Sequence, residues 1–358
     1  MRVSQKRLEL LSPTNKSQNG YLRLIRSSPA LAGISFAIVG SVIWFLLEQG
    51  AIFLGAGSQQ LPLDGMLVLL LSMQLGYFVA ALPLLRAAGQ RCIAELRPLL
   101  DYSDPAVVTL IKRFDTSRPP VLRITFIVGA CLTVFLQELQ FARFSQWLAQ
   151  PDFALGEIWT VLTAWATWSL GLAATIVVVT DAAAMRHLGR DHVSVDLMRI
   201  EQLTGFSRYG LQLATTVIGL MALWAVSLVL ISPFVGPDLA EKSRSIGLFL
   251  VLVYVTLAIT VFSFPQLGIR ERIRTEKARI CNELTNLLPS SRDIVEQVDA
   301  NPSLLAGPLT ARAMIQDVPE WPAGQLTQLR LAFYLLVPLL SWSAAALVEE
   351  IISRMLTN

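Results

Sequence analysis

The sequence predicts an all-α protein that crosses a membrane seven times. Seven long apolar stretches alternate with charged segments, and hydrophobic residues make up 54% of the chain while charged residues make up only 15%. That composition is typical of helices that face lipid or one another rather than water. The second observation is the distribution of Lys and Arg, because 25 of the 29 basic residues fall in alternate segments between the apolar stretches.

Each apolar stretch is bounded by charged residues. A hydrocarbon core of about 30 Å needs roughly 20 helical residues, and six of the stretches meet that length or come close to it. The third has only 14 uncharged residues, so it crosses only if Arg123 reaches back to one interface and Glu138 lies at the other. The predicted spans are residues 27–47, 65–85, 124–137, 158–180, 209–237, 245–269 and 331–348.

The basic residues predict the orientation, because Lys and Arg near membrane spans stay on the cytoplasmic side. The N-terminus is therefore expected inside and the C-terminus outside. This topology divides the chain into a cytoplasmic tail (1–26), spans one to four (27–180) with a cytoplasmic loop (86–123), a cytoplasmic juxtamembrane loop (181–208), spans five and six (209–269), a cytoplasmic helical segment (270–330), and span seven with a short outer tail (331–358).

Short sequence similarities suggest an internal repeat. Leu82-Pro83 near the end of span two matches Phe264-Pro265 near the end of span six, and Leu122-Arg123-Ile124 before span three matches Leu329-Arg330-Leu331 before span seven. Spans one to three would then correspond to spans five to seven, as a parallel repeat about an axis along the membrane normal. The other interpretation is chance similarity between apolar helices that carry an interfacial arginine.

The cytoplasmic segment contains a pattern typical of a helical hairpin. Beyond Ile273, apolar or long side chains recur in steps of four and three, Pro289 ends that helix, and Ile294 and Val298 mark one face of a second one. The spaced positions form either a docking seam for a partner or a surface that packs on the protein's own helices. The candidate docking seam consists of Ile273, Ile280, Leu284 and Leu287.

Small and polar residues inside the spans indicate close helix packing. Small-residue stripes with a spacing of four permit close helix contact and interhelical hydrogen bonds. Gln74 is the most polar residue well inside a span, and ionisable groups are nearly absent there, which argues against proton-coupled transport but leaves a neutral pore open. The stripes are Gly33, Ala37 and Ser41 in span one, and Thr163, Thr167, Gly171 and Thr175 in span four.

Motifs for catalysis or metal binding are not found in the sequence. The two histidines, His187 and His192, are five residues apart and do not share a helical face, so we expect a solvated loop rather than a metal or pH-sensing site that recruits Asp181 and Asp191. The three cysteines have no metal-ligand spacing, and no nucleophile and base can be matched in depth. We therefore expect no cofactor, no metal and no enzymatic activity.

Three stretches resemble an uncharacterised group of multispan bacterial inner-membrane proteins. They are Phe264-Pro265-x-x-Gly268 followed by Ile273 to Leu284, the segment Val195 to Leu211, and Pro338-Leu339-Leu340-Ser341-Trp342. The resemblance implies a location in the bacterial inner (plasma) membrane. It implies no substrate, cofactor or catalytic residue.

Three classes of function remain. The first, which we expect, is a non-enzymatic membrane module that senses, scaffolds or docks a protein partner through residues 270–328. The second is a homo-oligomeric channel or passive transporter, in which outer acidic residues such as Glu48 attract cations. The third is an intramembrane enzyme. A nucleic-acid partner is not expected, because no soluble module with a basic face is present. Candidate interfacial or pathway residues are Arg123, Glu138, Arg330, Glu349 and Gln74.

Overall fold

The computed structural model consists of long helices over the residues that it describes, which confirms the all-α class. Four helices are long and apolar enough to cross a membrane: Pro29–Gly50, Gly65–Leu99, Gly156–Asp191 and Val251–Asn286. Val121–Phe135 and Leu326–Leu336 are shorter apolar helices. The described residues are 28–53, 61–100, 104–115, 119–141, 155–231, 237–286, 302–322, 324, 326–336 and 340.

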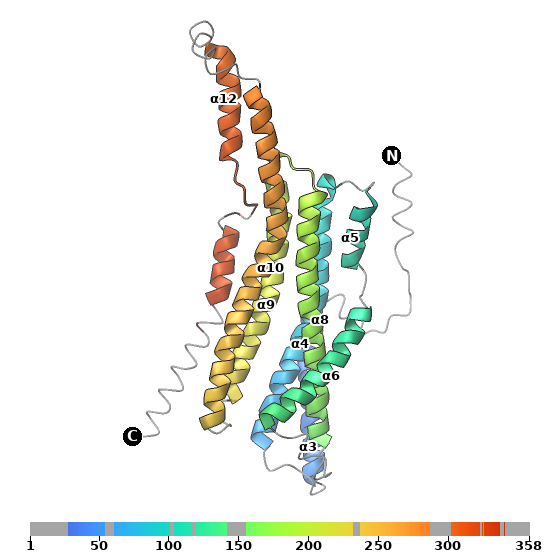
Figure 1. The fold of residues 1–358 in the computed structure, drawn as a ribbon. Helices are drawn as coiled ribbons and strands as arrows, with labels where there is room; N and C mark the ends of the chain where they lie inside the picture. The colour runs from blue at the N-terminus through green and yellow to red at the C-terminus, as the bar shows by residue number, and fades with distance from the viewer. Residues whose placement is uncertain are drawn as a thin grey trace, which may run out of the picture.

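The long helices run side by side as an elongated bundle (Figure 1). In chain order the elements are α3 (Pro29–Phe53), α4 (Leu61–Leu96), the 3-10 helix η1 (Arg97–Leu99), α5 (Pro105–Asp115), α6 (Pro119–Phe141), α8 (Leu155–Asp191), the 3-10 helix η2 (Leu197–Leu203), α9 (Thr204–Ile231), α10 (Pro237–Asn286) and α12 (Pro302–Asp317).

Two helices, α4 and α8, hold the bundle together. α3 packs on both of them, α6 packs on α8, and α9 and α10 pair with each other while contacting α4 and α8 respectively. The end of the bundle at which η1 and η2 lie is here called the polar end. There α10 continues beyond the other helices, and α12 lies along its final turns (Figure 1).

Glycines let the backbones of α3 and α4 touch. A Cβ atom at Gly33 would overlap the carbonyl oxygen of Gly76, and a Cβ atom at Gly76 would overlap that of Gly33. Ala37 and Ala80 are the next neighbours at this crossing. The predicted contact of the first small-residue stripe is therefore present, and it follows the small-residue packing that helices use in lipid.

Glycines also allow close contact between other pairs of helices. A Cβ atom at Gly268 of α10 would overlap the backbone of Arg186 in α8, and Gly210 of α9 lies against the carbonyl of Phe262 in α10. In the second predicted stripe, the Thr167 hydroxyl donates to the carbonyl of Leu71 in α4 at 3.2 Å. Close backbone approach thus recurs at α8–α10 and α9–α10, and a hydrogen bond joins α8 to α4.

The polar end contains the largest buried cluster, and there the backbone segments that follow α4 and α8 are hydrogen-bonded to each other. Met185 and Leu188 of α8, Phe206 of α9 and Ile269 of α10 are fully or almost fully buried there. The segments that follow α4 and α8 meet at an isolated bridge between Leu100 and Val193. The backbone amide and the hydroxyl of Ser194 both donate to the carbonyl of Leu99, each at 3.1 Å. The turns after the two central helices are therefore joined to each other.

Several helices continue beyond the predicted span ends, α8 and α10 among them. The helix α8 continues past residue 180 to Asp191, and α10 includes both the predicted outer loop 238–244 and the charged residues after 269. A run of charges ends an apolar stretch without ending a helix, because Arg, Lys and Glu are good helix formers. Pro265 lies inside α10, and the helix continues on both sides of it.

The α3–α4 crossing generates a prediction about stability. Gly33→Ala places a methyl group against the Gly76 backbone, so we expect a loss of about 1–3 kcal/mol from overpacking. Gly50→Ala is the matched control in the same helix, because a Cβ atom at Gly50 has no neighbour within 4 Å. Thermal unfolding of the purified variants in one detergent measures the difference. Equal unfolding temperatures would contradict the close crossing.

Candidate functional site

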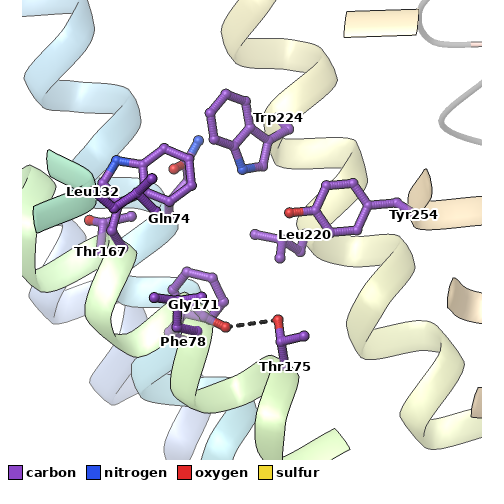
Figure 2. Close-up of a pocket in the computed structure, with 11 residues that line it drawn as sticks. Gln74, Phe78, Leu132, Thr167, Gly171, Thr175, Leu220, Trp224 and Tyr254 are labelled. Atoms are coloured by element: carbon purple, nitrogen blue, oxygen red, sulfur yellow. Dashed lines mark hydrogen bonds between the residues drawn. The ribbon is translucent and has the colours of Figure 1, made fainter. Parts of the chain in front are cut away.

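A cavity of about 80 Å³ lies between α4, α6, α8, α9 and α10 (Figure 2). The side chains of Gln74, Thr167 and Trp224 line one part, and Phe78 and Tyr254 line another. Gly171 of α8 faces the Phe78 ring and leaves it room, since a Cβ atom there would lie 3.1 Å from Cζ of the ring. The cavity has space for a few water molecules and is much smaller than the roughly 300–1,000 Å³ typical of drug-sized ligand sites.

Gln74, a predicted pathway residue, lines this cavity. Its side chain is 4% exposed, and its Nε2 donates to Oγ of Ser227 in α9 at 3.1 Å. Ser227 in turn donates to the carbonyl of Leu223 at 2.7 Å. Gln74 therefore connects α4 to α9 by an interhelical hydrogen bond, in addition to presenting an amide to the cavity.

Aromatic rings and neutral polar groups make up the rest of the lining. The rings of Trp168 and Trp224 lie 5.2 Å apart, and the hydroxyl of Tyr254 points towards the cavity in Figure 2. Thr175 donates to the carbonyl of Gly171 at 2.9 Å, so its hydroxyl is already paired. All the lining residues are uncharged. This surface suits water or a small neutral molecule with one polar group.

A buried carboxyl group lies at the polar end. Asp181 of α8 is 5% exposed, and the hydroxyl of Tyr209 in α9 donates to its Oδ2 at 3.1 Å. Phe114 of α5 packs edge-on against the Tyr209 ring, and Gly89 of α4 leaves space for both rings. This contact joins four helices around one polar pair. Sequence reasoning missed the pairing, although an aspartate directly after an apolar span was visible.

The two histidines lie close together at the end of α8, and one of them is helical rather than in a loop. Nδ1 of His187 lies 3.0 Å from Asp191, Nδ1 of His192 lies 2.9 Å from Asp104, and the rings stack 5.8 Å apart. Each imidazole thus has its own carboxylate, while Asp181 is bound elsewhere. Within the described part of the chain, no group of three or more His, Cys, Asp and Glu side chains has a metal-binding arrangement.

The end of α10 and α12 are joined by charge and by apolar contacts. Nε of Arg274 lies 2.6 Å from Glu320, and the guanidinium of Arg270 lies 4.5 Å from the centre of the Trp321 ring. Lys277 donates to the carbonyls of Gln316 and Val318 at the end of α12, where cations stabilise unpaired carbonyls. The hydrogen bond from Arg274 holds the pKa of the Glu320 carboxyl below its ordinary value.

The predicted docking seam is largely covered by this contact. Ile273 is fully buried, and Ile280 and Leu284 are half-buried against the cluster that contains Ile315 of α12. Leu287 lies outside the described residues. Over the described positions, the seam therefore packs on the protein's own helices.

The other candidate residues lie apart from the cavity. Arg123 in α6 and Arg330 in the helix Leu326–Leu336 are exposed. Glu138 is in α6, but its side chain and all of Glu349 fall outside the described structure. Glu48, expected as an outer acid, is 2% exposed and lies against Gly156 at the start of α8. Among the candidates whose side chains the structure describes, Gln74 is the one at the cavity.

No family model, curated protein or solved structure matches this chain. The geometry of the described helices is therefore the basis for a functional proposal. The resemblance to bacterial inner-membrane proteins stays a prediction.

The Asp181–Tyr209 pair generates a second prediction. Tyr209→Phe removes a hydrogen bond from a buried carboxyl, so we expect the free energy of unfolding to fall by about 1.5–3 kcal/mol. Tyr254→Phe is the control, because the Tyr254 hydroxyl forms no hydrogen bond with a described residue, and it is expected to change little. Chemical denaturation of both variants in one detergent gives the comparison. A larger effect of Tyr254→Phe would contradict the assignment.

Proposed function

We propose that this protein is a non-enzymatic integral membrane protein that senses, scaffolds or docks a protein partner. The docking element lies within residues 270–328, and the name arm is used here for its described parts 270–286 and 302–322, which contain the end of α10 and α12. The observation that carries the proposal is the continuity of α10, a single helix of 50 residues that includes a candidate span and extends beyond the bundle. A contact made on the arm therefore acts directly on a helix of the bundle.

The connection between arm and bundle is apolar and buried. Ile269 and Ile273 are both 0% exposed and lie on α10 where the arm begins, in one cluster with Met185 of α8 and Phe206 of α9. Packed cores have discrete arrangements rather than continuous ones, so movement of the arm would require this cluster to repack. That is the property expected of a sensory or docking subunit.

Exposed apolar side chains on the arm offer contacts for a protein partner. Leu309 is 50% exposed and Met314 is 60% exposed, at two positions around α12. Exposed methionine and leucine among charged residues are typical of surfaces that adapt to partners. Arg279, on α10, forms ion pairs with Glu276 and Glu283, which give this region a polar rim.

A seven-span topology with the N-terminus in the cytoplasm belongs to the same proposal. The arm and both 3-10 helices would then lie in the cytoplasm of a bacterial cell, at its inner membrane. Support comes from the basic residues of α4 and α8 and five of the seven in α10, which lie towards the polar end, as expected when Lys and Arg stay on the cytoplasmic side. The helix α6 would form span three, and the helix Leu326–Leu336, together with the residues that follow it, would form span seven.

The order of the helices supports an internal repeat and a helical hairpin. The helices α3 and α4 pair strongly, α4 contains Pro83, and α5 and α6 follow. The helices α9 and α10 also pair, α10 contains Pro265, and α12 and the helix Leu326–Leu336 follow. The helix α8 would be the connector, and α10 with α12 would form the hairpin.

The cavity favours a second candidate function, a homo-oligomeric channel or passive transporter for a small neutral solute. The polar groups of Gln74 and Tyr254 at the cavity are the supporting observation. Flux through liposomes that contain only the purified protein distinguishes the two candidates. Flux that Gln74→Leu lowers would favour transport, and a tight bilayer would favour the docking function.

The docking proposal predicts which surface captures a partner. Removal of residues 270–328 would also delete the buried Ile273 and could disturb the bundle. Substitutions at exposed positions of α12 avoid that effect and are therefore the better test. The double variant Met314→Asp with Leu309→Asp should no longer be cross-linked to a partner in isolated native membranes. The reason is that burying a carboxylate at an apolar contact costs free energy of desolvation. Met198→Asp, at a methionine 73% exposed in η2, is the control and should keep the cross-links. Cross-links that survive the double substitution would contradict the proposal.

The Glu320 carboxylate predicts a pH dependence for the arm. Its pKa is lowered by Arg274, so its contribution to the α10–α12 contact is present above the ordinary value of 4.5 and is lost as pH falls through the lowered value. Hydrogen exchange of α12, corrected for the intrinsic pH effect, should accelerate over that range. In Glu320→Gln this acceleration should be absent and exchange should already be faster at neutral pH. An unchanged pH response in the variant would assign the effect to another group.

A further inference from the structure

A groove of about 520 Å³ runs along α9 on the side that faces the helix Leu326–Leu336. Its floor on α9 follows steps of three and four residues, which places the lining side chains on one face of the helix. From Arg208 to Ala222 this face is about 21 Å long. One leaflet contributes about half of a 30 Å hydrocarbon core, so the groove has the length of an acyl chain with its headgroup region. The groove does not share a lining residue with the cavity at Gln74.

The polar end of the groove carries positive charge. Arg208 is 71% exposed and contacts Glu95 at 3.2 Å through Nη1 alone. A guanidinium has five N–H donors, so several remain for a second acceptor. Arg330 lies four residues before Tyr334, which lines the groove, and is therefore on the same face of its helix. Arg208 thus lines the groove on α9, and Arg330 lies about one helical turn before the lining residue Tyr334 on the facing helix.

The lining changes from polar to apolar along the groove. Gln212 follows one turn after Arg208, is half-buried, and its side-chain amide forms no hydrogen bond with a described residue. Thr215 turns its hydroxyl to the Gln212 carbonyl, so it offers the groove its methyl group. Ile218 and Ala222 continue the apolar part. A positive charge, then an amide, then apolar side chains are complementary in order to the phosphate, ester and acyl chain of a glycerophospholipid.

We propose that this groove binds an anionic glycerophospholipid of the leaflet at the polar end. Arg208 and Arg330 bind the phosphate, because guanidinium groups match phosphate oxygens in charge and geometry. The Gln212 amide donates to an ester carbonyl, and one acyl chain lies along Ile218 and Ala222. The two arginines favour a headgroup of net negative charge, because the positive choline group of a zwitterionic lipid would be repelled by them. The site is independent of the arm and of the cavity, so it goes beyond the proposed docking function.

The test uses the full-length protein, delipidated in detergent and titrated in native mass spectrometry. Dioleoyl-phosphatidylglycerol and dioleoyl-phosphatidylcholine carry the same acyl chains and differ in headgroup charge. We expect the first bound phosphatidylglycerol to have an affinity about tenfold higher than phosphatidylcholine, which corresponds to about 1.4 kcal/mol. Arg208→Gln should remove most of that preference. Ala222→Trp, which fills the far end of the groove, should weaken both lipids and keep their ratio.

The matched control is Arg199→Gln. Arg199 is also 71% exposed and also has an acidic neighbour, Asp196 at 3.9 Å, but it lies in η2 outside the groove. It should keep the preference, and all variants should unfold at the temperature of the parent protein. The proposal is overturned if Arg208→Gln retains the preference, if Arg199→Gln loses it equally, or if soluble glycerol phosphate competes as well as the lipid. The last result would assign the arginines to a free anion.

Discussion

Close approach of helix backbones is the constraint on which this structure depends. Lipid is as apolar as leucine, so apolar side chains gain little by leaving it, and helices associate through van der Waals contact and hydrogen bonds. At the Gly33–Gly76 crossing a single methyl group has no space, and the contacts at Gly210 and Gly268 have the same character. Hydrogen bonds contribute as well, since the Thr167 hydroxyl of α8 is shared between the carbonyls of Thr163 in its own helix and Leu71 in α4. The cavity at Gln74 lies where larger rings, from Trp168 and Trp224, keep the helices apart.

At the polar end, the same helices are held by paired polar groups. Asp181 is bound by Tyr209, both histidines contact carboxylates, and Ser194 connects the turns after α4 and α8. Buried polar groups are costly alone and stabilise a unique arrangement when each has a partner. The base of α10 packs into this region through Ile269 and Ile273. The arm is therefore attached at the part of the bundle whose arrangement is most fully determined by directional contacts.

The sequence predicts features that repeat along a single helix, but it does not predict which side chains of two different helices come into contact. The stripe at Gly33 and Ala37 shows its period in the sequence, and the apolar stretches show their length. The pairing of Asp181 with Tyr209 depends on how α8 and α9 rotate towards each other, which no local pattern records. The length of α10 was underestimated because charged residues such as Arg270 and Glu271 end the apolar stretch, whereas the helix continues through them. Gln74 was singled out by polarity alone, and its partner Ser227 emerged only from packing.

The unbroken α10 has a mechanical consequence. Residues 265–286 form about 32 Å of rigid rod beyond Pro265, at a rise of about 1.5 Å per residue. Proline removes one backbone hydrogen bond and is a common place for a helix to bend. A bend of about 10° at that point would displace the tip of the rod by about 5 Å. Because Ile269 and Ile273 lie just beyond Pro265 and are fully buried, such a bend requires their contacts with the bundle to change, and these two side chains therefore control whether the far end of α10 can move.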